Sequence, residues 1–196
     1  GARLPLLSVV LVGNNPASMS YVRGKEKACS SIGMLQRTIR LDENVSQKEL
    51  NDVIMSLNLD SEVDGILVQM PLPSHLDETA ALELIDPQKD VDGLHPMNAG
   101  CLLTNRPGFI PCTPQGVMAM LDSIGCKDLS GKRAVVCGRS NLVGKPIALL
   151  LQNRNATVTI VHSKTPDIEK IASQADILIV AMGVACLLYT SPSPRD

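Results

Sequence analysis

Hydrophobic positions along the chain gather in short runs, and longer segments with a helical spacing of apolar residues separate these runs. The runs predict strands at residues 6–12, 35–41, 63–68, 134–137, 157–161 and 177–181. Strands that alternate with helices are typical of mostly parallel sheets covered by helices on both faces. The pattern therefore predicts an α/β fold.

Start signals for helices support this interpretation. They are Asn15 followed by Pro16, Ser46 three residues before Glu49, and Thr113 followed by Pro114. Asn, Ser and Thr side chains accept hydrogen bonds from the first N–H groups of a helix. Proline fits the first turn because its missing N–H is not needed there. We therefore expect helices to begin at these three places.

The segment 99–114 is rich in glycine, proline and asparagine and has no clear period, so we place the junction of two lobes near residue 115. Residues 1–115 are expected to form an αβα catalytic domain, and residues 116–183 an incomplete Rossmann-like dinucleotide-binding domain. Residues 184–196 show neither a helical nor a strand period. We interpret them as a non-native tail or, alternatively, as a native disordered terminus.

Composition narrows the class of protein. A chain of 196 residues, of which 44% are apolar, can build the core of one large domain or two small ones. Its net charge of −2 favours neither nucleic acid nor a membrane surface as a partner, and no segment resembles a membrane span. The six cysteines form no C-x-x-C pair and the three histidines share no ligand spacing, so neither a metal site nor a disulfide framework is indicated. A cytoplasmic protein is the simplest interpretation.

One of the two tyrosines, Tyr21, precedes Lys25 by four residues in the segment YVRGKEKACSSIG. In a helix that starts at Pro16, the two side chains project from one face. One residue could then hold a substrate while the other reacts with it. The alternative is that Tyr21 covers the edge of the sheet and Lys25 is simply solvated.

Polar side chains also follow a buried run. Gln69 ends the strand of DGILVQMPLP, at the edge where open α/β sheets bind ligands. The segment KDVDG sets Asp90 and Asp92 in a turn that ends at Gly93. Ordinary turn formation by aspartate is the alternative explanation of that pair.

The motifs YVRGKEKACSSIG, GILVQMPLP, KDVDGLHPMNAG and PCTPQG occur in this order along the chain. In order and spacing they resemble the family of bifunctional methylenetetrahydrofolate dehydrogenases/cyclohydrolases, in its bacterial form, from about residue 6 to residue 183. Members of that family have a helix before the first strand and further strands beyond the position of residue 183. The resemblance therefore implies a chain that is truncated at both ends.

The resemblance also implies a folate-binding cleft between the lobes, with Lys25, Gln69 and Asp92 as its catalytic residues. Lys25 would be the catalytic lysine, Gln69 would hydrogen-bond near it, and Asp92 would hold the amino-pyrimidine edge of the pterin. Tyr21 would stack on the aminobenzoyl ring. These roles suit the residue types, because a carboxylate accepts two parallel hydrogen bonds and a lysine with a lowered pKa can activate water or protonate a folate nitrogen.

The segment RAVVCGRSNLVGKPIALLL predicts a strand, a tight turn and a helix. It meets the dinucleotide pattern G-x-G-x-x-G only in part, because Gly138, Ser140 and Val143 occupy the three glycine positions and Gly144 follows one step later. Free N–H groups at the start of the helix would suit a phosphate group. The alternative is a plain corner between a strand and a helix.

The next strand ends in the residues HSKT. An NAD site usually places an acidic residue near this position, whereas NADP sites favour arginine and hydroxyl donors. We therefore predict NADP as the cofactor, with Arg139 and Ser163 as the residues that recognise its 2′-phosphate, and the two loops also resemble the family's NADP loop. His162 would border this site or act as a core or capping residue.

The activity that the resemblance implies is oxidation of 5,10-methylenetetrahydrofolate by NADP, followed by hydrolysis of 5,10-methenyltetrahydrofolate to 10-formyltetrahydrofolate. It belongs to the one-carbon metabolism that serves purine biosynthesis, and the intact protein would be a homodimer. Two alternatives remain open. One is another two-lobed NADP oxidoreductase, such as a shikimate dehydrogenase-like enzyme, and the other is a catalytically inactive fragment that binds folate or nucleotide.

Overall fold

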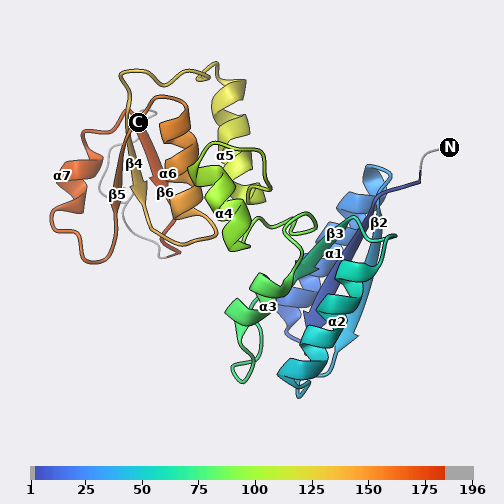
Figure 1. Cartoon of the computed structure of the whole chain (residues 1–196). Coiled ribbons are helices and arrows are strands. Elements are labelled where there is room, and N and C mark those ends of the chain that lie inside the picture. The colour runs from blue at the N-terminus through green and yellow to red at the C-terminus, as the bar shows by residue number, and fades with distance from the viewer. Residues whose placement is uncertain (1–2, 184–196) are drawn as a thin grey trace. The chain divides into compact units, whose positions relative to one another are not determined.

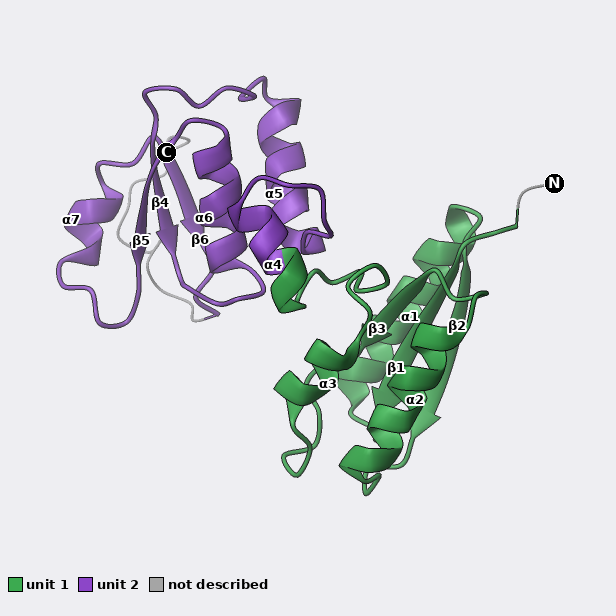
Figure 2. Cartoon of the chain, viewed as in Figure 1, with its two compact units in different colours: residues 1–98 green, residues 99–196 purple. Residues whose placement is uncertain are grey.

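The structure is a computed structural model that describes residues 3–183. The chain divides into two compact units, residues 1–98 and residues 99–196 (Figure 2). Each unit contains a sheet with three strands among the described residues, and every strand pair in it is parallel. The predicted α/β fold is therefore confirmed.

The first unit is a sandwich of one sheet between helices (Figure 1). Its elements are β1 (Leu6–Val12), α1 (Pro16–Ser31), β2 (Leu35–Leu41), α2 (Gln47–Leu59), β3 (Gly65–Val68), α3 (Glu78–Leu84) and the start of α4 (Pro96–Leu103). The strand order is β2-β1-β3, so the first strand lies in the middle. Polar side chains that follow β1 and β3 are therefore neighbours at the carboxyl edge of this sheet.

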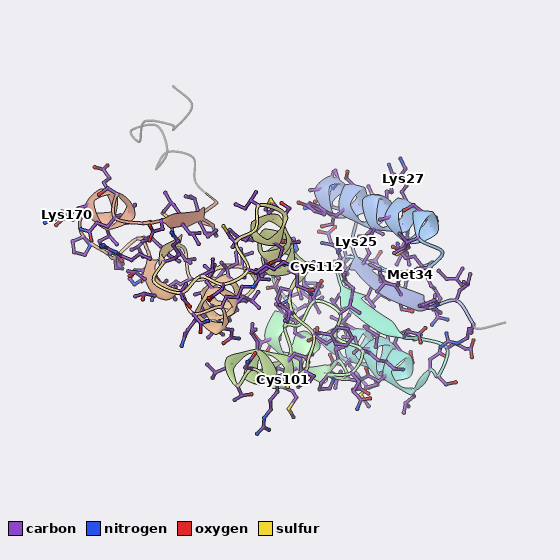
Figure 3. The ribbon with its side chains drawn as sticks, turned by 90° about the horizontal axis from the view of Figure 1, so that it is seen from above. Lys25, Lys27, Met34, Cys101, Cys112 and Lys170 are labelled. Atoms are coloured by element: carbon purple, nitrogen blue, oxygen red, sulfur yellow. The ribbon has the colours of Figure 1, made fainter. Side chains whose placement is uncertain are left out.

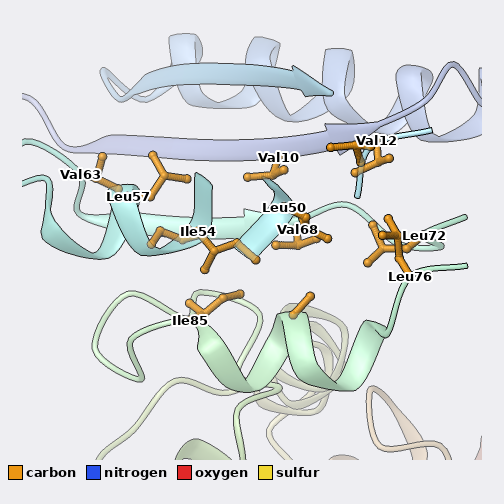
Figure 4. Packing of buried hydrophobic residues seen from close by; sticks show 13 residues of the cluster. Val10, Val12, Leu50, Ile54, Leu57, Val63, Val68, Leu72, Leu76 and Ile85 are labelled. Carbon is orange, nitrogen blue, oxygen red and sulfur yellow. The ribbon is translucent and has the colours of Figure 1, made fainter. Parts of the chain in front are cut away.

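Alternating residues of β1 divide the core of this unit between the two faces of the sheet. Val10 and Val12 belong to the larger cluster, in which residues of α2 and α3 such as Ile54 and Ala81 are fully buried (Figure 4). Val9 and Leu11 face the other way and pack with Val22 of α1. A strand that is apolar on both faces is expected in a parallel sheet covered on both sides.

The second unit repeats this plan. After α4 its elements are α5 (Cys112–Ser123), β4 (Arg133–Cys137), α6 (Gly144–Asn153), β5 (Thr157–Val161), α7 (Ile168–Ala172) and β6 (Ile177–Val180), and its strand order is β5-β4-β6. One core cluster joins Met118 of α5 and Ile147 of α6 to Val136 of β4. The opposite cluster joins Val135 and Cys137 to residues next to and within α7. β4, the first strand of this unit, is again the central strand of its sheet.

Two of the three helix starts are confirmed. Asn15 Oδ1 accepts hydrogen bonds from the N–H groups of Ala17 and Ser18 at 2.9 and 3.2 Å. Ser46 and Glu49 form a reciprocal capping box in front of α2. At the third place the expectation is wrong, because α5 begins at Cys112 and has no side-chain cap. Thr113 and Pro114 already lie in the first turn, where proline is tolerated because the N–H groups have no partner within the helix.

The junction between the units also differs from the expected position near residue 115. The division falls between Asn98 and Ala99, inside α4, and the segment 99–114 is part of the second unit. α4 begins where His95 Nδ1 accepts a hydrogen bond from the Met97 N–H at 3.0 Å. The sequence pattern missed this helix because eight residues are too few to show a clear period. The predicted tail at 184–196 lies outside the described residues.

Ser8 provides a stability prediction, because its hydroxyl oxygen is completely buried in β1 and is a side-chain atom without a hydrogen-bond partner. We expect Ser8→Ala to raise the free energy of unfolding by about 1 kcal/mol, since an unsatisfied buried hydroxyl is costly. Urea denaturation checks this value. Ser46→Ala makes the same chemical change at a cap that is in use and should lower the free energy of unfolding by about 1 kcal/mol. The prediction would be contradicted if both variants changed the free energy of unfolding in the same direction.

Candidate active site

Helix α1 brings the first two predicted residues to the carboxyl edge of the first sheet. The Asn15 cap and Pro16 set where the helix begins, which places Tyr21 and Lys25 one turn apart. Lys25 is partly buried, and Figure 3 shows it and the exposed Lys27 on different sides of α1. Tyr21 is 68% exposed. Lys25 is therefore not simply solvated, which was one half of the alternative explanation.

Gln69 follows β3 and faces Lys25. Its backbone N–H donates to the carbonyl oxygen of Val10 at 2.9 Å, which keeps the chain in register with β1. Its side-chain Nε2 donates to the Met70 carbonyl oxygen at 2.9 Å and fixes the orientation of the amide. The remaining amide oxygen, Oε1, accepts from Lys25 Nζ at 3.5 Å. This long contact leaves the ammonium group able to turn toward another partner.

Asp92 enters the same place from a turn that is attached to β3. Asp90 forms a parallel bridge with Ile66, and the Gly93 N–H closes the turn on the Asp90 carbonyl oxygen at 3.1 Å. Gly93 has φ of 65°, a left-handed conformation that glycine adopts without strain. Gly65 lets the turn approach closely, because a Cβ atom at this position would lie 2.5 Å from Val91 Cγ1.

Burial raises the pKa of the Asp92 carboxyl above its ordinary value. The positive charge of Lys25 opposes this rise, and the negative charge of Asp90 adds to it. Among residues 3–183 no hydrogen bond to the Asp92 side chain is seen, and a partly buried carboxylate of this kind, with a cation near it, is an acceptor that a ligand can satisfy. Lys25 is thus in contact with Gln69, and the Asp92 carboxyl lies near enough to be influenced by the Lys25 charge. Tyr21 lies one turn from Lys25 and is exposed.

Sequence reasoning did not assign a role to Asp90 and Asn98. Asp90 is 1% exposed, and its Oδ2 accepts from the His95 N–H at 2.8 Å and from Asn98 Nδ2 at 2.9 Å. These bonds tie the turn that carries Asp92 to the segment before α4. No usable signal for this contact is present in the sequence, because two polar residues eight positions apart match no helical or strand period.

In the second unit, β4 leads through a tight turn into α6. Gly138 has φ of 120°, and an added Cβ would collide with the carbonyl oxygen of Ala181. A Cβ on Gly144 would collide with the carbonyl group of Gly138. Backbone therefore lies directly on backbone at both glycines, which is the close approach that a dinucleotide-binding turn requires.

Two of the N–H groups that were expected to be free at the start of α6 are occupied. Ser140 Oγ accepts from the N–H groups of Val143 and Gly144 at 3.1 and 3.3 Å. The expectation was wrong for these two groups because the hydroxyl of Ser140, in the loop before the N-cap residue Val143, accepts both N–H groups. Among the described residues, the N–H groups of Arg139 and Asn141 make no hydrogen bond.

The carboxyl end of β5 lies beside this turn. Cys137 pairs with Val161, and the Gly138 N–H donates to the Val161 carbonyl oxygen at 2.8 Å. Arg139 and Ser163 therefore follow neighbouring strands at one edge, and both are exposed. In the described part of the chain neither side chain makes a hydrogen bond.

His162 is half-buried next to them. Its Nδ1 accepts from the Lys164 N–H at 3.2 Å, and its own backbone N–H donates to Thr165 Oγ1 at 3.0 Å. These bonds order the turn 162–165 and cap no helix, because α7 begins at Ile168 with Asp167 as its N-cap residue. Elsewhere, the described residues contain no group of three or more His, Cys, Asp or Glu side chains that could hold a metal ion. None of the described helices has the length and apolar character needed to cross a membrane.

Comparison with known proteins identifies both halves of the chain. Residues 1–92 match the family described as tetrahydrofolate dehydrogenase/cyclohydrolase, catalytic domain. Residues 111–192 match the NAD(P)-binding domain of the same family. The second match extends into the segment that was interpreted as a non-native tail.

Curated relatives are similar over nearly the whole chain. The bifunctional protein FolD of Oceanobacillus iheyensis is 56% identical over 183 residues, which cover 92% of this chain and 63% of the relative. The FolD protein of Enterococcus faecalis is 56% identical over 179 residues, with 91% and 63% covered. This chain thus spans about 63% of the length of these relatives.

Solved structures agree with the sequence matches. The FolD enzyme of Campylobacter jejuni is 49% identical with a TM-score of 0.91, covering 93% of this chain and 65% of that one. The Trypanosoma brucei FolD enzyme, solved with NADP and an inhibitor, is 42% identical with a TM-score of 0.86, covering 92% and 62%. A shikimate dehydrogenase solved with NADP⁺ is only 15% identical with a TM-score of 0.50, so the shikimate dehydrogenase-like alternative is not favoured.

The first unit has the expected side chains at its sheet edge, and the second has the expected turn between β4 and α6. Family matches cover both units, and the identity to bacterial FolD proteins exceeds one half over nearly all of the chain. The chain belongs to the tetrahydrofolate dehydrogenase/cyclohydrolase family.

Proposed function

We propose that this chain carries the folate and dinucleotide sites of an enzyme with two activities. The enzyme oxidises 5,10-methylenetetrahydrofolate with NADP and hydrolyses the resulting 5,10-methenyltetrahydrofolate to 10-formyltetrahydrofolate. The observation that carries this proposal is the meeting of the Lys25 ammonium group, the Gln69 amide and the Asp92 carboxyl at one sheet edge. The names of the relatives, which describe bifunctional FolD proteins, support the same pair of reactions.

Asp92 and Tyr21 would bind the substrate. The pterin presents an N–H and an amino group side by side, and an ionised Asp92 can accept a hydrogen bond from each. These donors would satisfy a carboxylate that is partly desolvated and has the Lys25 charge close to it. The exposed ring of Tyr21 offers a flat apolar surface one turn away, which suits the aminobenzoyl ring.

Lys25 and Gln69 would perform the hydrolysis. This reaction adds a water oxygen to the cationic one-carbon unit and breaks the bond from that carbon to one folate nitrogen. One water proton ends on that nitrogen, and the other is released to the solvent. As an amine, Lys25 Nζ can take the proton from the attacking water and return it to the departing nitrogen. The oriented Gln69 amide holds Nζ at the sheet edge while this proton moves.

The residues of the second unit fit NADP. The N–H groups of Arg139 and Asn141, which make no hydrogen bond among the described residues, could bind the pyrophosphate, and Ser140 and Val143 shape the start of α6. Arg139 and Ser163 offer a guanidinium group and a hydroxyl group for the 2′-phosphate, and His162 orders the loop that carries Ser163. When bound, the oxidised nicotinamide accepts a hydride from the one-carbon bridge, and this chemistry belongs to the cofactor.

Three wider expectations complete the proposal. The intact protein would be a cytoplasmic homodimer, and its product would supply one-carbon units for purine biosynthesis. Family membership supports these expectations, and the net charge of −2 supports small-molecule substrates over nucleic acid or anionic membranes.

Lys25→Met tests the catalytic lysine. We expect the variant to lose cyclohydrolase activity by about 100-fold or more, because methionine cannot transfer a proton. The decay of methenyltetrahydrofolate absorbance measures this rate. Lys27→Met is the matched control, since Lys27 is an exposed lysine on the same helix, and it should keep the wild-type rate. Wild-type turnover in Lys25→Met would refute the catalytic role of Lys25. If the unchanged chain binds folate but shows no turnover, the alternative of a catalytically inactive, folate-binding fragment is favoured.

Arg139→Ala tests the choice of cofactor. NADP should raise the melting temperature of the chain well above the increase that NAD produces, and Arg139→Ala should remove most of that difference. A charge-assisted contact of this kind is worth about 10-fold to 100-fold in affinity. Differential scanning fluorimetry measures the shifts, with Arg133→Ala, an exposed arginine at the opposite end of β4, as the control. Equal shifts from NADP and NAD in the unchanged chain would contradict the choice of NADP.

Asp92→Asn tests the electrostatics of the folate site through pH. Because folding raises the Asp92 pKa, the ionised carboxylate destabilises the folded chain at neutral pH, and this cost disappears as the pH falls through the raised pKa. Asp92→Asn should therefore be more stable than the wild type at pH 7, and the difference should shrink toward acid pH. Urea titrations at several pH values measure it. A difference that grows in acid would mean that the pKa is lowered.

A further inference from the structure

Lys89 makes an unusual set of contacts next to the candidate folate site. Its Nζ donates to three backbone carbonyl oxygens, those of Leu57, Asn58 and Asp60, at 3.1, 2.8 and 2.8 Å. An ammonium group has three donors, so all of them are used. These carbonyls belong to the end of α2 and its C-cap, where the helix leaves acceptors without partners and favours a positive charge.

α2 has no basic residue of its own in its last turn. The cation comes instead from a segment about thirty positions later in the chain, so the contact joins α2 to the turn that carries Asp92. A surface lysine would lose considerable conformational freedom in such an arrangement. The geometry therefore indicates a tether between two elements in addition to a helix cap.

The backbone of Lys89 is attached on the other side to the sheet. Its carbonyl oxygen accepts from the Ile66 N–H at 2.7 Å, and its own N–H donates to the Asp86 carbonyl oxygen at 2.7 Å. One residue later Asp90 is buried, and the Gly93 N–H closes the turn on the Asp90 carbonyl. Asp92 is thus three residues from Lys89, inside a turn whose entry is held by α2 and β3 together.

We infer that Lys89 is a positioning residue for Asp92: by binding the end of α2, its side chain sets where the Asp92 carboxyl stands relative to Lys25 and Gln69. This inference rests on the proposed function only as far as Asp92 contacts folate. The position of the carboxyl itself can be measured without any folate.

Arg37 provides a matched comparison. It forms an ion pair with Asp60, the C-cap of α2, at 2.9 Å, and so places a second cation at the same helix end. Arg37 lies on β2, and the side-chain hydrogen bond that it makes within the described part of the chain goes to Asp60 and not to the turn that carries Asp92. Arg37→Met therefore removes a cation from the end of α2 but leaves the tether intact.

The first measurement follows the Asp92 carboxyl by carbon NMR of aspartate-labelled protein, with the signal assigned by its loss in Asp92→Asn. We expect Lys89→Met to move the Asp92 titration midpoint by about half a pH unit or more toward that of an exposed aspartate. Arg37→Met should leave the midpoint unchanged. Lys89→Arg, which keeps a donor and a charge, should restore most of the wild-type value.

The second measurement uses 5-formyltetrahydrofolate as the probe in a double-mutant cycle by calorimetry. Lys89→Met should weaken binding by about tenfold in the wild-type background and have little further effect in Asp92→Asn, because residues that act through one another are not additive. Arg37→Met should bind as the wild type does. Additive losses from Lys89→Met and Asp92→Asn would overturn the inference.

If Lys89→Met folds and the titration midpoint of its Asp92 carboxyl equals the wild-type midpoint, the inference is also overturned, whatever the affinity for folate. If Lys89→Met does not fold, Lys89→Gln replaces it, because the shorter, neutral amide cannot supply the three donors that Lys89 Nζ uses. An Asp92 midpoint in Lys89→Gln that equals the wild-type value then counts against the inference. Absence of binding in the unchanged chain would refute the folate proposal alone, because the NMR titration still decides whether Lys89 positions Asp92.

Discussion

The candidate folate site depends on a backbone pairing that adds residues 89–90 to the outer side of β3. Ile66 donates its N–H to the Lys89 carbonyl oxygen at 2.7 Å, and the bridge continues to Asp90. Gly65 permits this approach, because any side chain there would collide with Val91. Since Gln69 leaves the same strand, this pairing gives Asp92 a defined distance from the amide that holds Lys25. The site is therefore a property of one sheet edge, to which α1, β3 and the turn each contribute one group.

The two units place different kinds of groups at the carboxyl edges of their sheets. In each, the first strand is central, and polar groups follow it and its neighbours at the carboxyl edge. The first unit presents side chains, and its candidate site contains an ammonium group and a partly buried carboxyl group. The second presents mainly backbone, because Gly138 and Gly144 bring the turn and α6 into direct contact. A reacting group must be held by side chains, whereas a phosphate can be held by N–H groups.

The strands could be predicted from the sequence, because apolar runs set them, and so could the place of Gln69, because parallel strands deliver their ends to one edge. That Lys25 and Asp92 belong beside Gln69 was implied by the family resemblance, since one stands on a helix and the other in a turn. The ends of β1, β2 and β5 agree with the predicted runs residue for residue. What the sequence did not reveal depends on tertiary contacts. His95 starts α4 through a side-chain nitrogen, Ser140 uses N–H groups that the motif left open, and Lys89 binds a helix end far away in sequence. No local period encodes such contacts.

Ser140 changes what the start of α6 offers to the solvent. Its hydroxyl oxygen already accepts hydrogen bonds from two N–H groups that would otherwise be free to bind an anion. An anion that binds there must displace the Ser140 hydroxyl from these two N–H groups, or it must bind the neighbouring N–H groups of the turn. One serine therefore reduces the number of free donors that the start of α6 offers to an anion, before any ligand has bound.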